Sequence, residues 1–115
     1  MADRLRVAVV TPLCEELRAL VERLEPRVEM VLDQELLPPV RYPADHIGDP
    51  AFVRSPAQQR RFEEIIAGAD ALYGLPGEDP AALRAAVMAN PRLGWVHTMA
   101  AGGGAQVRAA RLSPD

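Results

Sequence analysis

The chain has 115 residues, of which 49% are hydrophobic and 25% are charged, and its formal net charge is -3. This balance is typical of one soluble globular domain, and the slight acidity argues against a nucleic-acid partner, which would favour a basic surface. All 13 basic residues are arginines, which excludes Schiff-base chemistry and the lysine of a phosphate-binding loop. The single cysteine, Cys14, excludes an internal disulfide framework and a cysteine-rich zinc site.

The first elements predicted along the chain are a strand, a helix and a second strand. Residues 4–11, RLRVAVVT, form an unbroken apolar run, which predicts a strand buried on both faces. The run is too short to span a bilayer and no signal peptide precedes it, so we expect no membrane segment and a cytoplasmic location. A helix from Pro12 to Pro26 follows, and residues 28–32 form the second strand. The apolar residues of this helix recur at helical spacing: Leu13, Leu17, Leu20, Val21 and Leu24.

A long connection, residues 33–54, separates this strand from the next helix. It contains four prolines and has no clear period. A connection of this length is unusual inside a compact domain and is often functional. His46 lies in it beside Asp45 and Asp49, but one histidine and two carboxylates are a weak metal signal. We therefore expect His46 to be a hydrogen-bonded loop residue and predict no metal site.

The second half of the chain repeats the alternation of helix and strand. Ser55 and Gln58 predict a helix start, because a hydroxyl N-cap followed three residues later by glutamine forms a capping box. Residues 69–74 and 93–98 read as strands, and between them Asp79 opens another helix. The inward-facing residues predicted for the two helices are Phe62, Ile65 and Ile66, then Leu83, Val87 and Met88. Residues 105–112 have the pattern of a last helix.

This alternation predicts an α/β fold with a flavodoxin-like, doubly wound parallel sheet of four strands in a three-layer αβα arrangement. Ligands of such sheets bind beyond the carboxyl ends of the strands. We therefore expect three segments to meet at one edge: residues 11–12, 73–77 and 98–104.

The glycines of the last segment suggest a ligand. A dinucleotide-binding (Rossmann) fingerprint starting at Gly102 would need a glycine where Val107 stands, and no acidic residue follows to bind a ribose. The glycine run is therefore either a tight turn or a carboxylate site built from helix N-terminal N–H groups. We interpret Cys14 as a small core residue, and His97 as a packed or solvated side chain without a carboxylate to orient it as a base.

Three stretches resemble a known family: ADALYGLPG, LRAAVMANPRLGWVHTMAAGGGAQ and the loop LLPPVRYPADHIGDPAF within residues 36–54. Over nearly its whole length the chain resembles the N-terminal half of the D-isomer-specific 2-hydroxyacid dehydrogenases. The resemblance implies that residues 1–115 are a substrate-binding (catalytic) domain that ends before the NAD-binding domain. That missing domain would bind NAD or NADP and supply the catalytic arginine, acid and histidine, so no catalytic or cofactor-binding residue is expected in this chain.

The resemblance also implies the substrate site. The turn Ala100, Ala101 and Gly102 would donate backbone N–H groups to the carboxylate of a small 2-keto or 2-hydroxy acid, such as glyoxylate or hydroxypyruvate. Tyr73 and Gly74 would line the opposite wall. Relatives often carry a branched and an acidic residue where this chain has two further glycines, which leaves the substrate preference open.

Two further expectations concern the protein as a whole. A stand-alone flavodoxin-like module that binds ligands or proteins without catalysis is the alternative to an oxidoreductase domain, and a corepressor role is a third, weaker candidate. A domain cut from its enzyme would leave apolar surface and a strand edge uncovered, so we expect a homo-oligomer, with residues 107–112 displaced or swapped onto a neighbour.

Overall fold

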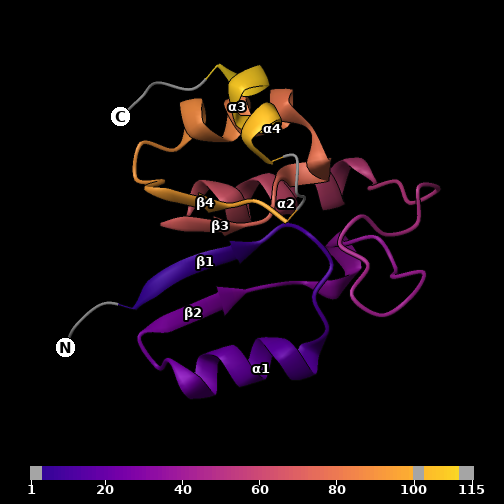
Figure 1. Cartoon of the computed structure of the whole chain (residues 1–115), viewed down its shortest axis with the longest axis vertical. Coiled ribbons are helices and arrows are strands. Elements are labelled where there is room, and N and C mark those ends of the chain that lie inside the picture. Colours follow the sequence, from indigo (N-terminus) through magenta and orange to yellow (C-terminus); the bar gives the residue numbers. More distant parts are fainter. Residues whose placement is uncertain (1–3, 100–102, 112–115) are drawn as a thin grey trace.

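The computed structural model describes residues 4–99 and 103–111 (Figure 1). No helix in this part of the chain is long and apolar enough to cross a membrane. The strands are β1 (Leu5–Val9), β2 (Val28–Val31), β3 (Ala71–Tyr73) and β4 (Trp95–His97). The helices are α1 (Glu15–Leu24), α2 (Pro56–Ala67), α3 (Pro80–Ala89) and α4 (Gly103–Ala110), and the short 3-10 turns are η1 (Gln34–Leu36) and η2 (Pro76–Glu78).

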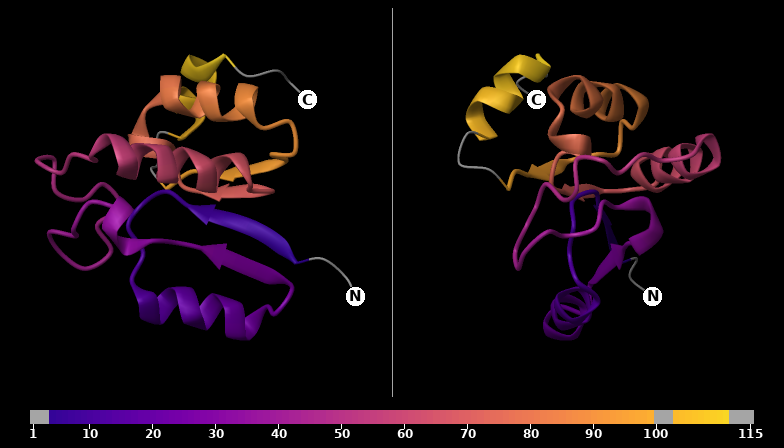
Figure 2. Two further views of the ribbon diagram at one scale, coloured as in Figure 1. Left: turned by 180° about the vertical axis from the view of Figure 1, so that it is seen from behind. Right: turned by 90° about the vertical axis from the view of Figure 1, so that its right-hand side faces the viewer.

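The strands form one parallel sheet in the order β2-β1-β3-β4. The step from β1 to β2 and the later steps to β3 and β4 run in opposite directions across the sheet. Right-handed crossovers therefore place α1 on one face and α2 and α3 on the other, as Figure 2 shows. α4 lies beside α3, where Arg84 Nη1 donates hydrogen bonds to the carbonyl oxygens of Ala110 (3.2 Å) and Arg111 (2.5 Å). The predicted flavodoxin-like αβα fold is confirmed.

The face of the sheet under α2 and α3 carries the main core. Leu72 of β3 is 1% exposed and pairs in register with Ala8 of β1, while Leu83 of α3 is fully buried. Phe62 and Ile66 of α2 complete this layer, as their spacing predicted. Burial of each of these large apolar side chains contributes about 1.5–3 kcal/mol to folding.

Polar contacts fix the ends of the two covering helices. The predicted capping box is present, since the Ser55 hydroxyl accepts from the Gln58 N–H and the Gln58 side chain accepts from the Ser55 N–H. At the other end, the buried amide of Asn90 donates to the carbonyl oxygens of Ile66 (3.0 Å) and Ala69 (2.8 Å). These bonds tie the end of α3 to the exit of α2.

The opposite face of the sheet is covered only in part: Met30 of β2 and Ala71 of β3 are buried on it, whereas its β4 end is open. α1 has no buried residue, and Leu17 is 50% and Leu24 74% exposed. Tyr73 pairs in register with His97, and Trp95 lies two residues before it, so these three side chains share one face. Trp95 is 63% exposed. The apolar stripe predicted for α1 therefore exists but is not part of a closed core.

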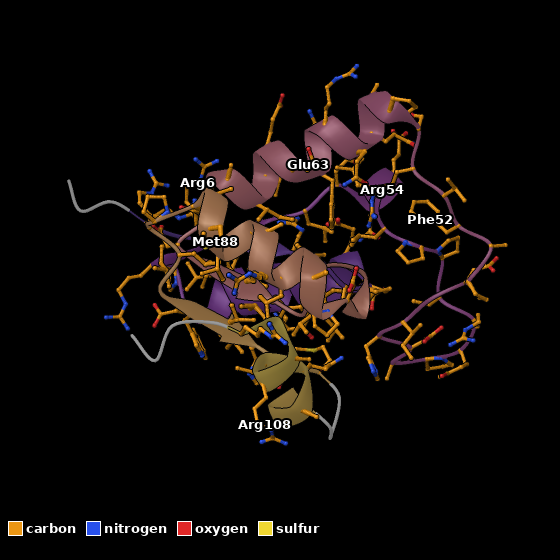
Figure 3. The ribbon with its side chains drawn as sticks, turned by 90° about the horizontal axis from the view of Figure 1, so that it is seen from above. Arg6, Phe52, Arg54, Glu63, Met88 and Arg108 are labelled. Carbon is orange, nitrogen blue, oxygen red and sulfur yellow. The ribbon has the colours of Figure 1, made fainter. Side chains whose placement is uncertain are left out.

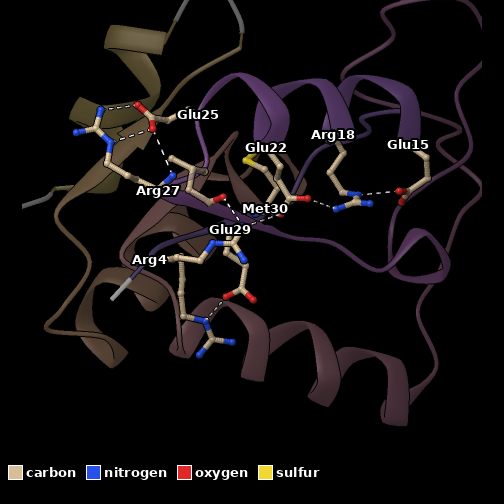
Figure 4. A network of polar contacts seen from close by, with 10 residues as sticks. Arg4, Glu15, Arg18, Glu22, Glu25, Arg27, Glu29 and Met30 are labelled. Atoms are coloured by element: carbon tan, nitrogen blue, oxygen red, sulfur yellow. Dashed lines mark hydrogen bonds and ion pairs between the residues drawn. The ribbon is translucent and has the colours of Figure 1, made fainter. Parts of the chain in front are cut away.

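The outer edge of the sheet, along β2, is covered by charged side chains (Figure 4). Glu22 of α1 accepts a hydrogen bond from the Met30 N–H at 2.9 Å, and Arg18 donates to the same carboxylate at 2.7 Å. Arg4 Nη2 donates to the carbonyl oxygen of Val28 at 2.9 Å. Charged groups on an edge strand oppose its pairing with another chain, so β2 is a poor template for association.

Several sequence predictions about individual residues were wrong. Cys14 is exposed and occupies the N-cap of α1 with an extended backbone, so the helix begins at Glu15 rather than at Pro12. Met88, predicted to face inward, is 73% exposed because α3 buries Leu83 and Ala86 instead.

The boundaries of two other elements also differ. The first strand ends at Val9, and its early residues Leu5 and Arg6 are exposed, so only its last part is buried on both faces. The last helix begins at Gly103 instead of residue 105. Glycine is a poor helix former, which is why Gly103 and Gly104 were predicted to precede the helix.

Candidate functional site

The carboxyl ends of β1, β3 and β4 lie side by side. The Val10 N–H donates to the Tyr73 carbonyl oxygen at 3.1 Å, and the Gly74 N–H donates to the His97 carbonyl oxygen at 2.8 Å. These bonds bring the segments that follow the three strands to one edge of the sheet, where parallel α/β folds bind ligands. Of the predicted substrate-binding residues, Tyr73 and Gly74 lie at this edge, whereas Ala100, Ala101 and Gly102 lie outside the described residues.

Gly74 has a structural reason to be glycine. Its φ is +93°, a left-handed conformation that side chains disfavour, and a Cβ atom built on it would lie 2.5 Å from Thr11 Oγ1 and 2.9 Å from Thr11 Cβ. The backbone of the turn after β3 therefore contacts a side chain of the turn after β1. Because its N–H is already bonded within the sheet, Gly74 contributes a wall to this edge and not a donor.

The aromatic residues at the same edge are only partly covered. Tyr73 is half-buried, and its ring centroid lies 6.4 Å from that of exposed His97. Trp95 meets the His97 ring edge-on at 6.1 Å. His97 is thus exposed beside two aromatic rings, and no ion pair joins it to a carboxylate among the described residues.

The long connection folds back over the carboxyl ends of β1 and β3 as an ordered loop. Its anchor is Asp45, whose side chain is 1% exposed. The carboxylate accepts hydrogen bonds from Arg41 Nε at 2.9 Å, from the Arg41 N–H at 3.1 Å and from the Ile47 N–H at 3.1 Å. The Arg41 guanidinium holds the pKa of Asp45 well below its usual range. Asp45 is thus engaged within the loop and is not available as a metal ligand.

A second feature fixes the shape of the loop. Gly48 has a φ of +81°, and a Cβ atom there would lie 2.6 Å from Pro38 Cβ. The Asp49 N–H donates to the Pro39 carbonyl oxygen at 2.9 Å, which closes the loop on itself. The connection is therefore a folded element, which neither its lack of period nor its prolines revealed.

Between this loop and the strand ends lies a cavity of about 210 Å³, here called the loop cavity. Its volume is below the roughly 300–1,000 Å³ of drug-sized ligand sites, so it suits a small molecule. The polar side chains that line it come from the turn after β1 and from the loop: Thr11, His46, Asp49 and Arg54.

Three of these four side chains have unused hydrogen-bonding capacity within the described residues. Thr11 is 2% exposed, and its Oγ1 has no hydrogen-bond partner. Arg54 makes no ion pair, although its Nε donates to the Leu36 carbonyl oxygen at 2.6 Å. His46 is half-buried and no hydrogen bond joins it to another described residue, so the prediction of a hydrogen-bonded loop histidine was wrong.

A larger cavity of about 490 Å³ lies between α2 and α3. Its walls are mainly small and apolar, with Phe62 and Ile66 on one side and Ala82, Ala85 and Ala89 on the other. Arg54 and Gly77 line both cavities. The loop cavity is the better candidate for chemistry, because polar groups converge there at the carboxyl edge of the sheet.

The sequence predicted the edge of the sheet at which the candidate site lies, but it did not predict which charged residues line that site. Thr11 was placed in the correct segment, since a hydroxyl follows the first strand. Nothing in the sequence distinguishes Arg54 from the other arginines except its place just before the Ser55 cap. No group of three histidine, cysteine or acidic residues within the described chain could hold a metal ion.

The chain matches no protein-family model, no curated protein and no solved structure. Its function is therefore inferred from the site and from the motifs of the sequence.

Proposed function

We propose that this chain is the substrate-binding domain of a cytoplasmic NAD(P)-dependent oxidoreductase that interconverts 2-keto acids and D-2-hydroxy acids. Its ligand is a small carboxylic acid such as glyoxylate or hydroxypyruvate, bound between the turn after β4 and the wall formed by Tyr73 and Gly74. Alone, the domain binds the acid without turnover.

One observation carries this proposal. The Gly74 N–H is bonded to the His97 carbonyl oxygen, so β3 and β4 end together, and α4 begins at Gly103 shortly afterwards. The first N–H groups of a helix lack intrahelical partners and carry partial positive charge. A strand end that leads through glycines into a helix supports a carboxylate site that needs no cationic side chain.

The nicotinamide cofactor belongs to a different domain in this proposal. A dinucleotide pyrophosphate needs a glycine-rich turn after a strand, so that the backbone can approach it closely. The turn between β1 and α1 runs from Val10 to Cys14 without a glycine, and Thr11 there is packed against Gly74. The turn does not fit the cofactor, and no hydride-transfer step is assigned to this chain.

An amide-shift titration tests the proposal. With isotope-labelled protein, glyoxylate or oxalate should shift the amides of residues 98–104 and of Tyr73 and Gly74 most strongly. The dissociation constant should be no tighter than about 1 mM, the strength of a few hydrogen bonds in a wet site. The same protein should not oxidise NADH with glyoxylate, hydroxypyruvate or pyruvate. Turnover above the blank, or no shift in residues 98–104, contradicts the proposal.

A stand-alone binding module is the second candidate, and the open face of the sheet favours it. Exposed Leu17 and Leu24 on α1 and exposed Trp95 on β4 are apolar groups that a partner would cover. In either case we propose that the chain self-associates through this face. Sedimentation at several protein concentrations measures this, and a monomer at every concentration excludes it.

A further inference from the structure

We propose that β4 pairs with β4 of a second copy of this chain, antiparallel and about a two-fold axis, so that two four-stranded sheets join into one. The inference rests on the self-association proposed above and names the strand edge at which the two copies meet. Three observations support it: the two edges of the sheet differ, the backbone groups of Val96 are free, and the sequence around them carries no charge.

The polar backbone groups on the outer side of β2 are already bonded within the chain. The carbonyl oxygen of Arg27 accepts an N–H of β1 at 2.7 Å, and backbone groups alternate in direction along a strand. Val28 and Met30 therefore point their groups away from β1. Arg4 donates to the Val28 carbonyl oxygen and Glu22 accepts from the Met30 N–H, both at 2.9 Å. Another strand would have to displace these two side chains.

The outer side of β4, the strand at the other end of the sheet, has no such protection (Figure 1). The His97 carbonyl oxygen accepts the Gly74 N–H, so the backbone groups of Trp95 and His97 point toward β3. Those of Val96, between them, point away from β3. No hydrogen bond within the described residues uses the N–H or the carbonyl oxygen of Val96. An open edge of this kind is a template for another strand.

The sequence around β4 also lacks the charges that protect an edge strand. No Asp, Glu, Lys or Arg occurs between Leu93 and Val107, although 25% of the chain is charged. After β4, the first charged side chain is that of Arg108, which is exposed on α4 and points away from α3 in Figure 3. Two copies can therefore meet at β4 without like charges inside the paired segment, despite a net charge of -3 on each.

The free groups of Val96 fix the register of the pair. Val96 is the central residue of β4 and lies opposite its own counterpart, so each copy donates the Val96 N–H to the Val96 carbonyl oxygen of the other. Trp95 then lies opposite His97 of the second copy, on both sides of the axis. Both side chains are exposed in one chain, and cross-strand aromatic pairs stabilise paired strands.

The size of the contact sets its strength. A stable dimer buries about 800 Å² on each partner. An edge strand of three residues with its flanking rings covers less, so the pairing belongs with weak, transient contacts. We expect dimers only at high protein concentration, with a dissociation constant weaker than about 1 μM.

Amide hydrogen exchange of the full chain at several protein concentrations tests the pairing. The Val96 amide should exchange fast in dilute solution and several-fold more slowly at high concentration, because only a second copy gives it a partner. The Gly74 and Met30 amides are the controls, since both are bonded within the chain and should be protected equally at every concentration. Dimers in which the Val96 amide still exchanges fast overturn the proposal.

A mixture of labelled and unlabelled chains tests the register. A nuclear Overhauser effect between Hα of Trp95 and Hα of His97 of the other copy is expected, because these two residues form a non-hydrogen-bonded antiparallel pair, whose backbones approach most closely. Dimers without this contact overturn the antiparallel register.

Val96→Pro removes the outward N–H without removing a bond to β3, and proline is tolerated on an edge strand where the N–H faces outward. It should weaken dimerisation by at least about tenfold, since both central hydrogen bonds are lost. Val96→Ile keeps the backbone groups and is the matched control, which should associate like the wild type. If Val96→Pro does not fold, the exchange and Overhauser measurements on the wild type decide.

Sedimentation separates the strand pairing from the broader self-association proposed above. A monomer at every concentration contradicts both. A dimer that Val96→Pro keeps but Leu24→Ser loses is formed through α1, and it overturns only the strand pairing. The titration with glyoxylate or oxalate reports on the substrate site by itself, so its failure leaves the pairing of β4 to be judged by these measurements.

Discussion

The two faces of the sheet differ in how completely they are covered. Under α2 and α3, Leu72 and Leu83 are 1% and 0% exposed, whereas on the other side Leu24 of α1 and Trp95 of β4 are 74% and 63% exposed, although Ala71 beside Trp95 is buried. Both faces belong to the same strands, and α1 and α2 both have apolar residues at helical spacing. The difference shows that periodicity tells which side of a helix is apolar, but not whether anything covers that side.

The clearest test of this comparison is to make the same substitution, leucine to alanine, on both sides of the sheet. Leu83→Ala should lower the free energy of unfolding by about 2–5 kcal/mol, because it removes a buried side chain and leaves a cavity. Leu24→Ala should change it by no more than about 0.5 kcal/mol, because that side chain is mostly in water. Urea unfolding of both variants measures this, and a similar loss for both would mean that α1 is packed against something in solution.

A second pair sharpens the comparison at the strand ends, where a crowded and an open glycine both have positive φ. Gly74→Ala should destabilise the fold by about 2–4 kcal/mol, since backbone strain adds to the collision with Thr11. Gly77 has a φ of +61°, and a Cβ atom added to it would meet nothing within 4 Å, so Gly77→Ala should cost only about 1 kcal/mol. Thermal melts of the two variants compare them. Equal losses would show that the contact with Thr11 is unimportant.

These pairs also show which features of the fold could be predicted from the sequence. The parallel sheet, the Ser55 capping box and the buried stripe of α2 follow from local rules, because strand runs, caps and helical spacing each depend on a few neighbouring residues. The exposure of Leu24 and Met88 could not be predicted in this way, because it depends on which elements pack across the sheet.

The candidate site was predictable only in part, for a related reason. The strand-end segments followed from topology, so Thr11, Tyr73 and Gly74 were correctly placed at one edge of the sheet. Arg54 and the loop cavity depend on how residues 33–54 fold back, and that fold is fixed by non-periodic contacts such as the one between Asp45 and Arg41. Those contacts leave no periodic pattern in the sequence.

A third comparison sets a buried ion pair against an exposed one. In Asp45 and Glu25 the carboxyl pKa is lowered by an arginine, to about 2 in Glu25. A carboxyl whose pKa is lower in the folded state adds stability above its unfolded pKa, and that stability is lost as the pH falls through the folded value. Asp45→Asn should therefore lower the melting temperature at neutral pH. Between pH 5 and about pH 2, the melting temperature of this variant should fall less than that of the wild type.

The matched control is Glu25→Gln, which removes an exposed pair with Arg27. Exposed pairs contribute little, so its melting temperature should stay within the error of the measurement. If the two variants melt alike at neutral pH, the loop is not anchored by Asp45.

The smallest effect on stability is expected at Trp95, on the open face. Threonine suits a strand, and the tryptophan is 63% exposed, so Trp95→Thr should change the free energy of unfolding by no more than about 0.5 kcal/mol. The same variant should weaken self-association, because aromatic side chains carry much of the binding energy at protein interfaces. Sedimentation of the wild type and the variant over a range of concentrations separates the two effects. Val53→Thr, at an 82% exposed position of the loop, is the control that should leave association unchanged. If Trp95→Thr associates like the wild type, the open face around β4 is not the surface through which the chains meet.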